Sequence, residues 1–242
     1  MATWTVHFRI ADYYIHELNG IDDSEFAVGS VAPDCGYGEK DSVGKFTPPP
    51  TVTHWSPTGN KRDCRYKDFM KEFLLPSKTQ REYSFYLGYY IHLLTDIMWS
   101  SEMFICTKRS FTDRSEKTKD FLKKIKRDWN GLDLKYFACH SDILSYRLIE
   151  EKGEVQDYLP YYEKGQLTNQ IKYIADYYKD KSKYENMNRS FTFLNADKID
   201  NFIVTAENII NENLKSNRIA RFKYDNIWSP KTIPENAYAV NI

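Results

Sequence analysis

The hydrophobic pattern of the chain is strongest in residues 83–105, YSFYLGYYIHLLTDIMWSSEMFI. Large apolar side chains occur all around the helix that these residues would form, which is typical of a buried central helix. A few polar or small residues follow one another at steps of four: Ser84, Gly88, His92, Asp96 and Ser100. Each step of four turns an α-helix about 40° past a full turn, so these residues form one line along the helix.

His92 and Asp96 are one turn apart on this line, and Gly88 removes bulk one turn before them. An ionised carboxylate in the interior of a protein is costly unless a positive charge or a metal ion pairs with it. A metal ion would pair with both side chains at once. A hydrogen bond between His92 and Asp96 that only orders the core is the alternative that these two residues leave open.

Most of the remaining chain also has helical periodicity. The predicted segments are residues 4–18, 22–31, 65–75, 112–129, 166–178 and 196–214. We find no stretch with the strict alternation of apolar and polar residues that predicts a sheet. The sequence therefore predicts an all-α fold, a multi-helix bundle around the central helix, with residues 222–242 as an extended tail. Without an internal repeat or a Gly/Ser-rich linker, we expect a single domain over residues 1–242.

Composition and charge exclude some classes of protein. Of the 242 residues, 41% are hydrophobic and 28% are charged, which excludes a membrane-embedded chain. Lys+Arg and Asp+Glu both number 34, so no bulk attraction to nucleic acid or lipid headgroups is expected. Arg9 and Asp12 interrupt the apolar stretch that a signal peptide needs, and the four cysteines form no CxxC motif. We therefore expect a cytoplasmic protein without a membrane span.

One segment, residues 33–64, lacks helical periodicity and is rich in proline and glycine. Long loops inside a compact domain are often functional. Asp34 opens this loop and His54 lies near its end, so both could complete a coordination sphere on the buried helix. Incidental surface residues are the alternative. In the first helix, His7 shares a face with apolar residues, whereas His16 lies about 180° away and should be at the surface.

In order, the motifs VHFRIAD around His7, GSVAPDCG with Asp34, VTHW with His54 and YLGYYIHLLTD with His92 and Asp96 resemble the zinc-dependent phospholipase C family. The resemblance covers roughly the first 110 residues. It implies an all-helical fold, shared more distantly with single-strand-specific zinc nucleases. It also implies hydrolysis of phosphodiesters at a cluster of up to three zinc ions.

The resemblance assigns Asp34, His54, His92 and Asp96 to one zinc ion. Asp96 would bridge to a second ion that His7 also binds, and Asp34 would orient or deprotonate the attacking water. Imidazoles and carboxylates suit zinc, which lowers the pKa of a bound water.

Three departures from the family pattern concern the further ions. The first tryptophan, Trp4, follows three other residues, whereas mature secreted members begin with a tryptophan that binds the second ion. Glu102 stands where the family has a histidine, and His140 lacks a glutamate four residues later. We therefore expect one or two ions rather than three, zinc or another divalent transition metal, with Glu102 and His140 as weaker candidate ligands.

The sequence thus predicts a metal-dependent hydrolase that cleaves a lipid or small soluble phosphodiester. The alternative is a non-catalytic helical protein with a structural ion. The basic segment at residues 117–127 is interpreted as a solvated helix face, so no nucleic-acid partner is favoured. The sequence does not predict the oligomeric state.

Overall fold

The computed structural model describes residues 1–38, 45–111, 117–140, 142–187 and 189–222, and most of them are helical. The predicted all-α fold is confirmed. The α-helices are α1 Trp4–Glu17, α2 Asp23–Val31, α3 Pro50–Thr53, α4 Tyr66–Phe69, α5 Gln80–Met98, α6 Cys106–Phe111, α7 Thr118–Cys139, α8 Leu144–Glu150, α9 Gln166–Lys179 and α10 Ala196–Ser216. Short 3-10 helices are η1 Ala32–Asp34, η2 Lys61–Asp63 and η5 Lys181–Asn186, and π-helical turns are η3 Met70–Leu74 and η4 Trp99–Ile105.

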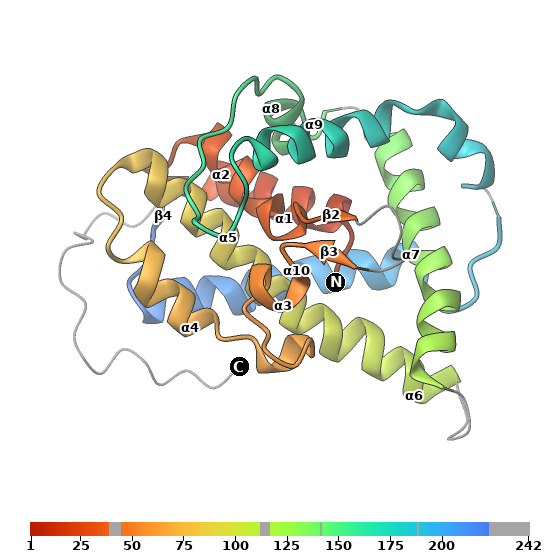
Figure 1. The fold of residues 1–242 in the computed structure, drawn as a ribbon. Coiled ribbons are helices and arrows are strands. Elements are labelled where there is room, and N and C mark those ends of the chain that lie inside the picture. The colour runs from red at the N-terminus through yellow and green to blue at the C-terminus, as the bar shows by residue number, and fades with distance from the viewer. Residues whose placement is uncertain (39–44, 112–116, 141, 188, 223–242) are drawn as a thin grey trace.

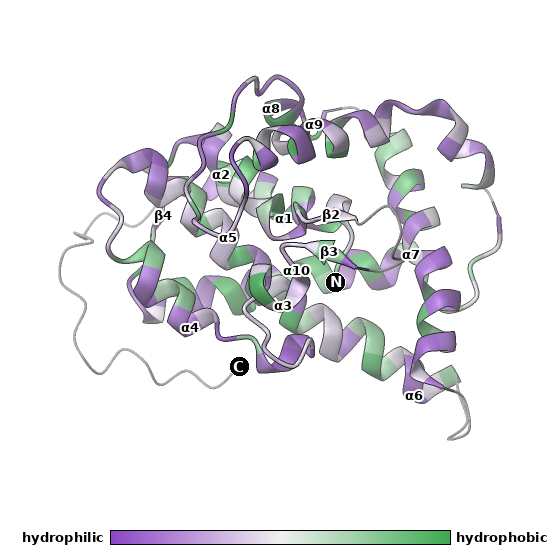
Figure 2. Ribbon diagram, in the orientation of Figure 1, coloured by the Kyte–Doolittle hydropathy of each residue, from purple (hydrophilic) through white to green (hydrophobic). Residues whose placement is uncertain are grey.

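The predicted central helix is α5, which continues without a break through η4 into α6. Figure 1 shows α5 running through the middle of the molecule, with α1 and α2 beside it. Its start is fixed by a capping box, in which the Thr79 side chain accepts a hydrogen bond from the backbone N–H of Glu82 and the Glu82 side chain caps Thr79 in return. Phe85, Tyr89 and Tyr90 of α5 are fully buried, and Figure 2 shows the hydrophobic residues of the inner helices. The burial of α5 on all sides agrees with its apolar pattern.

Helix α2 approaches α5 closely because glycines lie at their contact. A Cβ atom on Gly88 of α5 would lie 2.3 Å from the backbone oxygen of Phe26, and one on Gly29 of α2 would lie 2.0 Å from that of Phe85. Both distances are far below van der Waals contact, and the obstructing atoms are backbone. This close approach fixes the position of His92, one turn after Gly88, against the carboxyl end of α2.

We expect Gly88→Ala to lower the free energy of unfolding by about 3 kcal/mol, the upper part of the usual range for overpacking. Urea denaturation followed by circular dichroism measures this change. Gly153→Ala is the matched control, since nothing lies within 4 Å of its added Cβ. Equal stability of the two variants would show that α2 and α5 are not held at this distance by the glycine contact.

The structure adds short elements that the sequence did not predict. The segment 33–64, which lacks helical periodicity, contains η1, α3, η2 and the strands β2 Tyr37–Gly38 and β3 Phe46–Thr47, while its residues 39–44 lie outside the described part. β2 pairs with β3, and β1 Leu18–Asn19 pairs with β4 Arg221–Phe222, both antiparallel. These two-residue strands were not predicted, because they are too short to show alternation. Apart from Phe222, which lies in β4, the predicted tail falls outside the described residues.

Helix α7 begins at Thr118 and extends to Cys139, ten residues beyond the predicted end, and residues 112–116 lie outside the described part. Phe121, Ile125 and Trp129 are buried on its inner face, as their helical spacing predicted. Among the described helices, none combines the length and the apolar character that crossing a membrane requires.

Candidate metal centre

Five ligand-type side chains from separate parts of the chain converge in the interior. His7 comes from α1, Asp34 ends η1, His54 follows α3, and His92 and Asp96 lie one turn apart on α5. Their side chains are between 0% and 3% exposed. The structure thus brings together all five residues that the sequence nominated, and we call them the His/Asp cluster.

Within the cluster, His54, His92 and Asp96 form a triangle of donor atoms. The Nε2 atoms of His54 and His92 are 3.3 Å apart. Asp96 Oδ2 lies 3.5 Å from His54 Nε2 and 3.9 Å from His92 Nε2. Ligands of a tetrahedral zinc ion with bonds of about 2.0–2.1 Å are separated by about 3.3 Å, so this triangle is close to the size that zinc requires.

A second, overlapping set consists of His7, Asp34 and His92, whose donor atoms also lie within 4.8 Å of one another. The His7 ring stacks on the His92 ring at a centroid distance of 3.7 Å. His7 Nε2 lies 3.8 Å from Asp96 Oδ1 and has no hydrogen-bond partner among the described residues. Asp34 Oδ1 lies 3.1 Å from His54 Nε2. The assignment of ligands to one ion or two, as the sequence suggested it, stays a prediction.

Hydrogen bonds outside the cluster orient two of the imidazoles. His92 Nδ1 lies 2.8 Å from the backbone oxygen of Ser30, so Nδ1 carries the proton and Nε2 presents its lone pair to the cluster. His54 Nδ1 lies 3.0 Å from Thr53 Oγ1. When Nδ1 donates to this hydroxyl, His54 Nε2 also presents a lone pair, toward His92 and two carboxylates. Lone pairs that face one another in this way are suited to hold a cation, and hydrogen bonds that orient ligand histidines from outside are common in metal sites.

Burial sets the charge of the histidines. It lowers the pKa of His7 and His54 well below the usual value and lowers the pKa of His92 to about 4. Burial alone would raise the pKa of Asp96, but positive charges beside it, Lys61 among them, hold its pKa well below the ordinary value. At neutral pH the three imidazoles are therefore neutral and Asp96 is a carboxylate, the forms that bind metal ions.

Lys61 of η2 is part of the site, although the sequence analysis did not nominate it. Its Nζ lies 3.1 Å from Asp96 Oδ2, and its side chain is 12% exposed. The backbone N–H of Ala2 donates a hydrogen bond of 2.7 Å to the other oxygen, Asp96 Oδ1. Lys61 is one of 34 basic residues, and no motif marks it, so only the folded structure could identify it.

The two weaker candidate ligands do not join the cluster. Glu102 is exposed and lines a separate pocket with residues of α10, because the helix continues through η4 and carries this side chain away from Asp96. His140 is exposed at the end of α7, where its ring stacks on Tyr136. His16 is exposed, as its position on the first helix predicted.

Comparisons with known proteins agree with this geometry. The family model described as zinc dependent phospholipase C matches residues 6–99, a span that contains all five residues of the His/Asp cluster. The resemblance inferred from the sequence motifs is thereby confirmed for this part of the chain. Searches of curated proteins and of solved structures found no match.

Proposed function

We propose that the protein is a metal-dependent hydrolase of phosphodiesters, a proposal supported by the match of residues 6–99 to the zinc-dependent phospholipase C family model. The observation that carries the proposal is the convergence of three imidazoles and two carboxylates in one buried cluster. The spacing of His54, His92 and Asp96 fits zinc, and the buried atom His7 Nε2 lacks a hydrogen-bond partner among the described residues. We propose His7, Asp34, His54, His92 and Asp96 as the ligands.

Each residue then has a defined role. A bound zinc ion supplies Lewis acidity, which polarises the phosphoryl oxygen and lowers the pKa of a bound water. His54 and His92 hold their lone pairs in place through Thr53 and Ser30. Asp34 accepts a proton from the attacking water. Its carboxylate can accept this proton when the proton of the neighbouring His54 ring is on Nδ1, where it is donated to Thr53.

A catalytic role, rather than a purely structural one, is supported by access for a substrate. A pocket of about 1180 Å³ adjoins the cluster, and Lys61, the residue in contact with Asp96, lines it. An ammonium group at this boundary can bind an anionic oxygen of the diester while the phosphorus lies near the ligands. A structural zinc site needs no neighbouring pocket for a substrate.

The proposal is tested with soluble and aggregated substrates. We expect the protein to hydrolyse bis(p-nitrophenyl) phosphate at least as readily as phosphatidylcholine in micelles, because Lys61, which contacts Asp96, also lines a pocket with four further basic residues. Removing the metal with dipicolinate should abolish the release of nitrophenolate, and zinc should restore it.

Two results would contradict this account. Activity confined to aggregated lipid, rising steeply above the critical micelle concentration, would exclude the proposed preference for soluble diesters. A protein that retains its ion but cleaves neither substrate would favour the alternative of a structural metal.

A further inference from the structure

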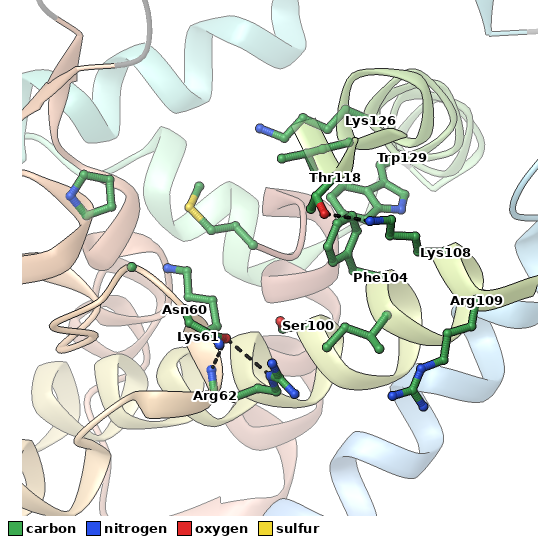
Figure 3. A pocket seen from close by; sticks show the side chains of 15 residues that line it. Asn60, Lys61, Arg62, Ser100, Phe104, Lys108, Arg109, Thr118, Lys126 and Trp129 are labelled. Atoms are coloured by element: carbon green, nitrogen blue, oxygen red, sulfur yellow. Dashed lines mark hydrogen bonds between the residues drawn. The ribbon is translucent and has the colours of Figure 1, made fainter. Parts of the chain in front are cut away.

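The pocket beside the His/Asp cluster is formed by elements that are distant in sequence. Asn60–Arg62 of the long loop lie on one side, and residues of η4, α6 and α7 lie on the others. Figure 3 shows Lys61 and Arg62 across the pocket from Lys108 and Lys126. Ser100, one turn after Asp96 on the central helix, also lines the pocket, so its inner end adjoins the cluster.

The charge of this pocket is strongly one-sided. Its lining includes five basic residues, Lys61, Arg62, Lys108, Arg109 and Lys126, and no acidic residue. Lys61 contacts Asp96, and Lys108 donates to Thr118 Oγ1 at 2.6 Å. In the described part of the chain, no carboxylate lies within ion-pair distance of Arg62, Arg109 or Lys126. The chain as a whole has equal numbers of basic and acidic residues, so this concentration of positive charge is local.

Positive side chains that face one pocket repel each other, and a bound anion relieves that repulsion. Arginine and lysine also form charge-assisted hydrogen bonds with phosphate, which are stronger than bonds between neutral groups. A cationic headgroup such as choline finds no carboxylate among the described residues that line this pocket. Phe104, Leu122 and Trp129 supply an apolar wall, which can pack against the part of the ligand that carries the anion.

We propose that this pocket binds a second anionic group of the substrate, a phosphate monoester attached to the same molecule as the diester at the metal centre. The placement of the diester at the metal centre rests on the proposed function. The binding of the additional phosphate by the basic residues does not depend on it. The substrate class is thus a phosphodiester with an additional phosphate. A phosphorylated inositol headgroup and a nucleotide with a further phosphate share this chemistry.

Binding of matched phosphate esters to the protein as purified tests the inference without any turnover. One pair is thymidine 5′-phosphate and thymidine 3′,5′-bisphosphate; the other is inositol 1-phosphate and inositol 1,4-bisphosphate. By isothermal titration calorimetry, we expect the bisphosphate of at least one pair to bind about tenfold more tightly, equivalent to about 1.4 kcal/mol. The pair with the larger difference identifies the source of the phosphate.

Substitutions of basic residues inside and outside the pocket test which side chains bind the second phosphate. Lys126→Gln should remove most of the tenfold difference, and so should Arg109→Gln. Lys123→Gln carries the same change of charge three residues earlier on α7, at an exposed position that does not line the pocket, and should preserve the difference. Raising the salt concentration should reduce the difference, because the pocket is open to solvent.

The outcomes separate this inference from the proposed function. Equal affinities for monophosphate and bisphosphate in both pairs would overturn the inference, as would a difference that Lys123→Gln removes as fully as Lys126→Gln. A difference that depends on Lys126, in a protein that cleaves no diester, would support the pocket and refute the hydrolase. Diester cleavage without any preference for the second phosphate would support the hydrolase and refute the phosphate-binding pocket.

Discussion

His92→Ala is expected to remove bound metal from the protein and to lower the free energy of unfolding by about 3–5 kcal/mol. The ring is fully buried: it contacts the backbone oxygen of Ser30, stacks on His7 and faces His54 Nε2 at 3.3 Å. Its removal leaves a cavity, an unpaired carbonyl and a ligand set with one imidazole less. Denaturation curves and elemental analysis measure the two effects on the same sample.

His16→Ala is the matched control for this variant. His16 lies on α1 like His7 but is exposed, so its removal should change the free energy of unfolding little and leave the metal content unchanged. A His92→Ala protein with the full amount of metal would show that His92 is a core histidine and not a ligand.

Asp34→Asn is expected to reduce diesterase activity by about 10²–10⁴-fold, the usual contribution of a general base, while the protein stays folded and keeps metal. The amide preserves the size of the side chain but cannot accept the proton of the attacking water. Asp96→Asn should instead reduce metal content and melting temperature. Asp96 contacts Lys61 and lies near three histidines, so its charge neutralises the centre of the cluster.

The two aspartate variants are compared by metal stoichiometry, melting temperature and diesterase rate, measured side by side. Full activity of Asp34→Asn would exclude Asp34 as the group that activates water. A loss of metal in Asp34→Asn as large as that in Asp96→Asn would assign Asp34 to the ligands alone.

The part of the site on the central helix could be predicted from the sequence, because local helix geometry determines it. The spacing of His92 and Asp96 places both on one face of any helix, and the apolar pattern around them predicts that the helix is buried. Asp34 and His54 were nominated more firmly by their order in the family motifs than by any spacing, since they lie on a loop. The distance of 3.1 Å between Asp34 Oδ1 and His54 Nε2 depends on how η1 and α3 pack against α5. Local sequence patterns do not predict this packing.

Other features depend on tertiary packing and were missed for that reason. Lys61 acquires its role only when η2 folds onto the central helix and its ammonium meets Asp96. Helix α8, which was not predicted, is only seven residues long, and Asp12 of α1 stabilises its start by accepting hydrogen bonds from the N–H groups of Leu144 and Ser145. The basic side chains of residues 117–127 are exposed, as interpreted, but only the fold shows that one of them, Lys126, lines the basic pocket.

The central claim is that the His/Asp cluster is a metal centre, and elemental analysis of protein purified without chelator tests it most directly. We expect one to two equivalents of a divalent transition metal per chain, zinc foremost, since the five side chains form two overlapping sets of three donors, each within 4.8 Å of one another. Less than about 0.2 equivalents of any transition metal, in a folded protein that also fails to take up added zinc, would contradict the claim.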